Sequence, residues 1–449
     1  MIFSIIIIYL ILLYIIKLRI KDSVSRNLIL IYTSYWIFSL VICNLNVYDY
    51  YLVDDMTYYL LLAHLVAFVL GFSMIQPKER FDLWTINTDL DIRKFLKNKF
   101  FICVFISAFL FTITLFIRQR ALLAVYNLMD IRGDFMELIL EDSGLAYLFH
   151  TIISTSVFHL SLVLLLFMLL FDRNWMYIII LASYIFMFAS LGGGRNQFMT
   201  LGYYFLTMYI LGNRIMTARN GFKTNFVLPR YIKIAMPIVI AFLIVAMSLM
   251  SAMRRGHMEL SKEAFNEGFS ELTETFGEYS AGPIVAFDIA MHDDYLSKLR
   301  HYGRATLNGT DYFLYILFHK YGFYKTSSYH TTITPLQHDG ISIGPDRRWN
   351  YAYTSCMFYH FDFGKLGVVL IPFFLGLIAR KLIGLIYNKL NFYSISIVLF
   401  ISFCLYMSVF SGYLHKMMSL FYLVICYFFA KRLIRKQSKS SVNRAESHR

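Results

Sequence analysis

The sequence predicts an all-α polytopic membrane protein, and three observations support this prediction. Of the 449 residues, 58% are hydrophobic and only 16% are charged, whereas an average soluble domain has about 25% charged residues. Long runs such as 2–16 and 393–410 carry no charge at all. The basic residues gather in a few loops and in the C-terminal tail. This composition excludes a disordered, collagen-like or disulfide-built chain and disfavours a soluble multidomain enzyme.

Spanning helices need about 20 mostly apolar residues. About eleven stretches of the chain fit this requirement: 2–16, 28–45, 57–75, 99–117, 147–171, 175–191, 196–212, 231–252, 366–387, 393–411 and 416–430. The first run lacks a basic n-region and a small-residue cleavage site, so we interpret it as a retained helix.

The charges of the loops predict the orientation. Segment 17–26 has four basic residues and one acid, whereas 44–55 has three Asp and no basic residue. Segment 76–99 has six basic residues, and the tail after 430 has seven with one acid. Basic loops stay on the cytoplasmic side, which predicts an outer N-terminus and a cytoplasmic C-terminus. The net charge of +14 therefore indicates membrane orientation and not nucleic-acid binding.

A long hydrophilic segment interrupts the spans. We expect spans 1–8 in residues 1–252, an extracytoplasmic loop domain in 253–365, spans 9–11 in 366–430 and a basic cytoplasmic tail in 431–449. Loops of this length are uncommon unless they are functional or folded. Apolar periodicity predicts three helices in the loop domain: one capped by Ser261, a second over 281–291, and a third starting after Thr310.

A Gly-rich turn lies between the sixth and seventh spans. Gly192 to Gly194 precede Arg195, which opens the next predicted helix. Helix N-termini attract anions, and a guanidinium adds a planar fork suited to phosphate. The alternative is a tight turn whose Arg side chain reaches the lipid headgroups.

Arginine is also frequent on the predicted outer side. Such residues are suited to bidentate binding of a diphosphate, and the alternative is pairing with acids of the same loop. The ten outer arginines are Arg118, Arg120, Arg132, Arg195, Arg254, Arg255, Arg300, Arg304, Arg347 and Arg348.

His360 and Asp362 precede the ninth predicted span and form a candidate acid–base pair, since a carboxylate can orient a general-base histidine. A surface or hydrogen-bonded structural histidine is the alternative. The five cysteines have no paired spacing, and Asp293–Asp294 lacks further ligands, so no metal site and no cofactor are expected.

Two motifs resemble those of O-antigen polymerases, the oligosaccharide repeat-unit polymerases of Wzy type. One is the Gly-then-Arg turn GGGRNQF at 192–198. The other is Asn350 to Thr354, an aromatic stretch, and Asp362-Phe363-Gly364 followed by Gly367 and Gly376. The large outer loop also fits this family.

The resemblance implies a GT-C-like glycosyltransferase of the bacterial inner membrane, with its active site facing the periplasm or exterior. Its substrates would be undecaprenyl-diphosphate-linked oligosaccharides, and a chain-length regulator and a flippase are possible partners. Arg195 would bind the diphosphate, with Arg254, Arg255 and Arg348 as further clamps, and His360 or Asp362 would act as base or orienter. Two alternatives stay open, an O-antigen ligase and, from another class, a polysaccharide flippase or transporter; a membrane acyltransferase is a weaker third.

Overall fold

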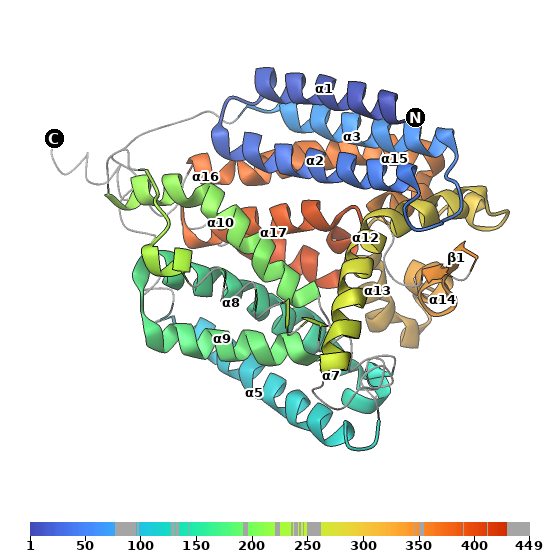
Figure 1. The fold of residues 1–449 in the computed structure, drawn as a ribbon. Helices are drawn as coiled ribbons and strands as arrows, with labels where there is room; N and C mark the ends of the chain where they lie inside the picture. The colour runs from blue at the N-terminus through green and yellow to red at the C-terminus, as the bar shows by residue number, and fades with distance from the viewer. Residues whose placement is uncertain are drawn as a thin grey trace. The chain divides into compact units, whose positions relative to one another are not determined.

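A computed structural model describes most of the chain. The described residues are 1–76, 96, 98–126, 131, 134–141, 143–191, 196–220, 225–234, 237, 241, 244–245, 247–248, 262–345, 347–349, 354–388, 390–410 and 412–428. They are predominantly helical, with one small antiparallel sheet (Figure 1). The predicted all-α membrane protein is confirmed at this level.

Six helical segments of the described residues are long and apolar enough to cross a membrane. They are α1 (Ile2–Arg19), α2 (Ser23–Leu45), α3 (Asp55–Met74), α5 (Lys99–Leu122), the stretch Gly144–Asp172 and the stretch Ser355–Tyr387. Gly144–Asp172 joins α7 (Gly144–Leu148), η3 (Phe149–Ser154), α8 (Thr155–Phe167) and η4 (Met168–Asp172). Three shorter apolar helices are α9 (Trp175–Ser190), α17 (Phe392–Met407) and Met417–Phe428. The predicted span 196–212 lies in α10 (Asn196–Asn220), and most of 231–252 lies outside the described residues.

The chain forms two compact units. One comprises residues 1–91, 210–224 and 280–449, and the other comprises 92–209 and 225–279. We call them the first and the second unit.

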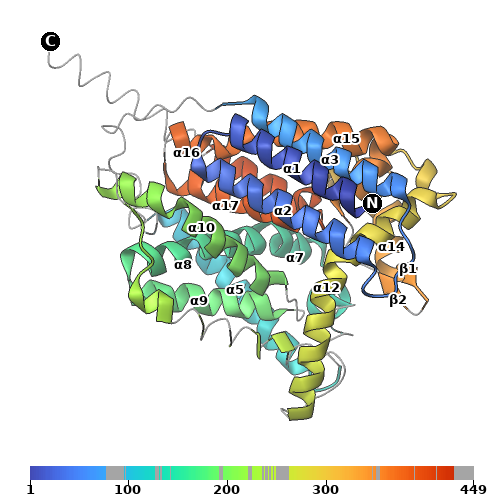
Figure 2. The same cartoon turned by 45° about the horizontal axis from the view of Figure 1, so that its top comes forward.

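In the first unit, α1, α2, α3, α15 (Ser355–Ile383) and α17 lie side by side (Figures 1 and 2). Glycines let α3 and α15 approach closely, as small residues do between membrane helices. A Cβ on Gly71 would overlap the carbonyl oxygen of Phe373, and a Cβ on Gly376 would overlap that of Phe68. The close contact therefore needs a glycine on each helix, Gly71 on α3 and Gly376 on α15.

We expect Gly376→Ala to destabilise the protein, because the new methyl group meets backbone atoms of α3 that cannot rotate away. Overpacking of this kind costs about 1–3 kcal/mol. Thermal unfolding in detergent should show a lowered midpoint. Gly202→Ala in α10 is the matched control, since no atom lies within 4 Å of its Cβ position, and an equal loss for both variants would contradict the proposed clash.

α15 differs from the predicted ninth span because it begins at Ser355 and not near residue 366. The helix bends sharply at Phe363 (φ −136°, ψ 18°) and Gly364 (φ 63°, ψ −152°), a left-handed conformation that favours glycine. Residues 355–362 are all buried. The loop and span predicted on either side of residue 366 therefore meet inside one bent helix.

The predicted loop domain is helical. The expected first and second helices are one continuous helix, α12 (Lys262–His292), which passes through Pro283 and from the second unit into the first. After it come η6 (Leu296–Lys298), α13 (Asn308–Phe318), η7 (His319–Tyr321), η8 (Tyr329–Ile333), α14 (Thr334–Asp339), β1 (Ile341–Gly344) and β2 (Arg347–Trp349). The chain continues after α15 with α16 (Leu385–Asn388), α17 and η9 (Tyr413–His415).

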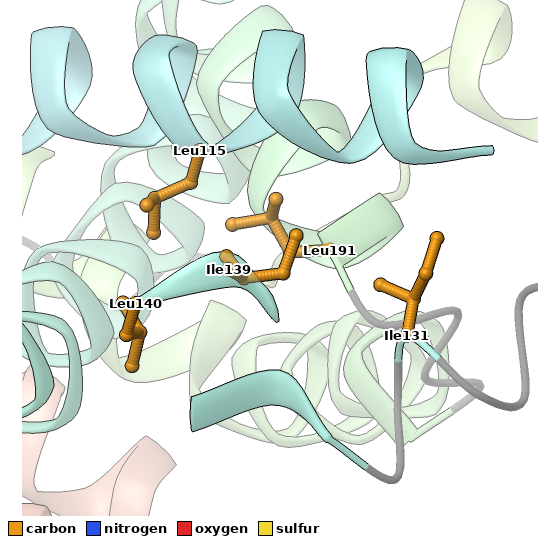
Figure 3. Close-up of a cluster of buried hydrophobic side chains, with 5 residues drawn as sticks. All are labelled: Leu115, Ile131, Ile139, Leu140 and Leu191. Carbon is orange, nitrogen blue, oxygen red and sulfur yellow. The ribbon is translucent and has the colours of Figure 1, made fainter. Parts of the chain in front are cut away.

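The second unit places α5, α8 and α9 side by side. A buried apolar cluster joins α5 to η2 (Phe135–Ile139) and to the end of α9 (Figure 3). It consists of Leu115, Ile131, Ile139, Leu140 and Leu191. Arg118, beside this cluster, pairs with Glu141 and donates to Leu138 O. For this arginine, the alternative of pairing with an acid of the same loop is therefore confirmed.

Candidate functional site

The candidate site lies in the first unit, where the bend of α15 meets residues 299–307. Asp362 is fully buried, and its two carboxylate oxygens accept the N–H groups of Ala305 (2.9 Å) and Thr306 (2.6 Å). The N–H of His301 donates to Phe361 O at 2.8 Å. The segment can turn here because Tyr302 and Gly303 adopt positive φ angles. Asp362 therefore fastens this segment to α15.

We expect Asp362→Ala to loosen residues 300–307, because two N–H groups lose their acceptor. An unsatisfied buried donor costs about 1–3 kcal/mol. Hydrogen exchange of peptides covering this segment should accelerate about tenfold or more. Asp339→Ala is the control, since Asp339 lies exposed at the end of α14; unchanged exchange in Asp362→Ala would show that other contacts hold the segment.

His415 holds the other side of the same segment. Its Nδ1 lies 2.6 Å from Thr306 O, and because a carbonyl only accepts, Nδ1 carries the proton and Nε2 presents its lone pair. Nε2 is buried and has no hydrogen-bond partner among the described residues. Gly412 permits this position, since a Cβ there would overlap the His415 ring. Burial lowers the pKa of His415 to about 4, although Thr306 and Asp362 oppose this shift.

A cavity of about 160 Å³ adjoins His415. Its wall is mainly apolar and comes from α2, α3, α15, α17 and the segments 306–307 and 412–415. Pro372, Leu375 and Leu382 of α15 line it, so the cavity follows that helix. Polar side chains also line it, among them Thr306, Ser355, Ser408, His64 and His415.

Buried hydrogen bonds order the polar part of this wall. Trp36 Nε1 donates to Ser408 Oγ at 3.0 Å, and the N–H of Ser355 donates to Ser408 O at 2.9 Å. His64 has Tyr32 Oη 3.3 Å from Nε2, and Cys356 Sγ 3.4 Å from Nδ1. Side chains that are held this firmly give the cavity a defined polar lining.

His360, the predicted base, is buried against Phe287 of α12, with the ring centroids 6.1 Å apart. Neither ring nitrogen has a hydrogen-bond partner among the described residues. The carboxylate of Asp362 is bonded to the 305–306 backbone and does not orient His360. The two residues lie together, but not as a hydrogen-bonded pair.

Two exposed cations flank the bend of α15. The Arg300 guanidinium lies against Gly364, where a Cβ would be 2.8 Å from its nitrogen, and Lys365 is the next residue of the chain. Both charges act electrostatically on His360. Arg348 lies exposed on β2, opposite Ser342.

Arg304 has a structural role. Its Nε donates to Asp311 at 2.8 Å, and its guanidinium also contacts Thr326 O and the ring of Tyr324. Burial raises the pKa of Asp311, but hydrogen bonds from Arg304, Tyr324 and Ser328 outweigh this effect and lower it. The expected pairing with an acid of the same loop is thus confirmed for Arg304.

Several predicted site residues cannot be placed. Arg195, Arg254, Arg255 and Asn350 lie outside the described residues. The described part of the chain contains no group of three metal-ligating side chains. Asp293 Oδ1 instead accepts the N–H groups of Tyr295 and Leu296, in the turn that follows α12.

His415 was not among the predicted site residues, because a lone histidine between two apolar runs is usually structural. No special role was predicted for Thr306 or for Lys365.

Comparison of the chain with protein-family models, with curated proteins and with solved structures gave no match.

Proposed function

We propose that this protein polymerises undecaprenyl-diphosphate-linked oligosaccharide repeat units into a surface polysaccharide, as its resemblance to O-antigen polymerases implies. The observation that carries the proposal is the apolar cavity along α15, whose polar lining includes a buried histidine with a free lone pair. A lipid-linked sugar needs apolar surface for its chain beside polar groups for its head, and a cavity of about 160 Å³ takes one segment of that chain.

Each group has a defined role in the proposed reaction. His415 Nε2 takes the proton from a hydroxyl of the acceptor sugar. The hydroxyl oxygen then forms a bond to the anomeric carbon of the donor, and the bond from that carbon to the diphosphate oxygen breaks. Arg300 and Lys365 stabilise the negative charge that develops on the leaving diphosphate. Asp362 positions the segment that bonds His415, and His360 remains a second candidate base.

Deleting the gene and separating the surface polysaccharide on a gel tests this proposal. A polymerase mutant should display single repeat units, because units still cross the membrane but are not joined. No surface material at all would favour the flippase. Long chains that accumulate on the lipid carrier without transfer would favour the ligase.

Arg195 remains the proposed clamp of the Gly-rich turn. We expect Arg195→Ala to reduce chain extension by about 10²–10³-fold, the cost of removing one electrostatic stabiliser of developing charge. Arg195→Lys should keep weak activity, because Lys has the charge without the planar fork. Gel analysis at equal protein abundance measures both. Normal polymer from Arg195→Ala, with Arg132→Ala as control, would leave the turn as a lipid anchor.

The finer topology is also a proposal: eleven spans, GT-C-like, in the bacterial inner membrane with the C-terminus in the cytoplasm. Two contacts support it. Gln76 Nε2 donates to Arg19 O at 2.5 Å, so the two segments 17–26 and 76–99, both predicted to be cytoplasmic, meet in the first unit. Arg380, near the C-terminal end of α15, pairs with Asp22 of the first of these segments. Reporter fusions after residues 90, 225 and 440 should behave as cytoplasmic and one within 320–345 as extracytoplasmic; the reverse pattern would contradict the proposed site.

A further inference from the structure

Five ring side chains form a partly exposed surface on α13, η7 and η8, which we name the aromatic platform. Its members are Tyr312, Tyr315, His319, Tyr329 and His330. Tyr312 lies 4.6 Å from Tyr329 and 5.2 Å from His330, between ring centroids. Tyr315 lies 4.6 Å from His319 and 4.8 Å from His330. The rings therefore form one continuous set.

A rigid frame holds the platform. Asp311, one residue before Tyr312, is only 3% exposed and fastens the chain from 304 to 328. It accepts the N–H of Ser328 at 2.7 Å and the Ser328 hydroxyl at 2.9 Å, in addition to its bonds from Arg304 and Tyr324. This carboxylate brings α13 and η8 together, so the platform rings keep their positions before any ligand arrives.

The platform is not part of the apolar core. Tyr312, Tyr315 and Tyr329 are half-buried, and His319 and His330 are exposed. Partial burial of the His330 ring, and then the neighbouring His319, lower the pKa of His330, so its ring is neutral at pH 7. Each member thus combines an apolar ring face with a polar edge that can donate or accept a hydrogen bond.

We propose that the aromatic platform is a saccharide-binding subsite, separate from the residues that carry out transfer, which holds sugar units of the chain under extension. This inference rests on the proposed function for the identity of its ligand. A pyranose ring has an apolar C–H face and a rim of hydroxyl groups, which match the ring faces and polar edges of the platform. Retention of the chain there keeps it near the enzyme between successive additions, so the platform sets polymer length.

The chemistry of the platform disfavours the hydrocarbon core of the bilayer as its occupant. All five members have a polar edge, whereas the exposed apolar side chains nearby, Leu317, Phe318 and Phe323, belong to a different set. On α13 and the η7 turn that continues it, the platform uses positions 312, 315 and 319, which share one face at helical spacing. Phe313, on another face, packs against Phe421 of the C-terminal apolar helix, with the centroids 5.0 Å apart.

Histidine labelling of the full-length protein in lipid nanodiscs tests the inference. The probe is a lipid-free oligosaccharide, released by mild acid from the surface polysaccharide of cells that carry the gene. Diethyl pyrocarbonate modifies accessible histidines, and mass spectrometry measures each site. The oligosaccharide should slow modification of His319 and His330 severalfold and leave the exposed His338 unchanged. Unchanged rates at all three would overturn the inference, and so would histidines that react in detergent but are already protected by nanodisc lipid, which indicate a membrane anchor.

Variants separate this subsite from the reaction centre. Tyr312→Ala should weaken oligosaccharide binding about tenfold, because it removes one ring on which a sugar face packs. Tyr312→Phe should keep most of the binding, because the ring remains. Tyr295→Ala, an exposed tyrosine outside the platform, is the control. Cells with Tyr312→Ala should make shorter polymer, and unchanged binding and chain length would overturn the subsite. His415→Ala should retain oligosaccharide binding, so failure of the proposed function would show in the gel while protection of the platform persists.

Discussion

Replacing His415 by Ala should reduce chain extension by about 10²–10⁴-fold, the usual contribution of a positioned general base. The buried ring holds its proton on Nδ1 through Thr306 O, so the proposed base is the unpaired Nε2 of a histidine that lines the cavity. Polymer length on gels, at equal protein abundance in the membrane, measures the effect. His338→Ala, an exposed histidine on α14, should leave activity unchanged.

The pH dependence of activity follows from the protonation state of this ring. The pKa of His415 lies near 4, so the ring is neutral and competent at neutral pH, and it becomes protonated as the pH falls through about 4. Activity of the purified protein should therefore persist above this range and decline below it. His415→Gln should be as inactive as His415→Ala even if its amide keeps the bond to Thr306. Substantial polymer from both variants would move the base to His360.

The membrane helices were predictable because their signal is compositional. A bilayer requires about 20 apolar residues per span, and α1, α2, α3 and α5 are close to the predicted ranges. The bend in α15 was not predictable in this way. Residues 355–362 contain polar and ionisable side chains and resemble a loop, yet packing against α3, α12 and α17 buries them all. Tertiary contacts therefore override the local pattern there.

The sequence pointed to Asp362 as a candidate site residue, but not to the residues that it binds. A carboxylate before a span suggests an acid–base role, whereas its bonds to Ala305 and Thr306 depend on a turn far away in the chain. His415 was missed for the same reason. The tautomer and position of its ring depend on the bond to Thr306 O and on the close approach that Gly412 permits. Long-range contacts of this kind leave no periodic signal in one sequence.

A buried ion pair at the opposite end of α15 should carry a large share of the stability of the first unit. Arg380, 1% exposed, places its guanidinium 2.7 Å from Asp22 and donates through Nε to Ile75 O at 2.9 Å. Asp22 also accepts the N–H of Ser25 at 2.8 Å and the hydroxyl of Tyr387. Burial raises the pKa of Asp22, but Arg380 and these hydrogen bonds lower it overall. The carboxylate is thus charged at neutral pH.

Removing one charge of this pair leaves the other buried without compensation, which costs about 3–5 kcal/mol. We therefore expect Arg380→Met and Asp22→Asn each to lower the free energy of unfolding by about that amount, measured by denaturant titration in detergent micelles. Asn at position 22 can still accept the bonds from Ser25 and Tyr387, so its loss isolates the charge. The double variant should recover most of the stability, because it buries no net charge. Lys381→Met, at the exposed neighbouring position, should change little. If the double variant is as unstable as the sum of the two single variants, the pair acts through its hydrogen bonds and not through its charges.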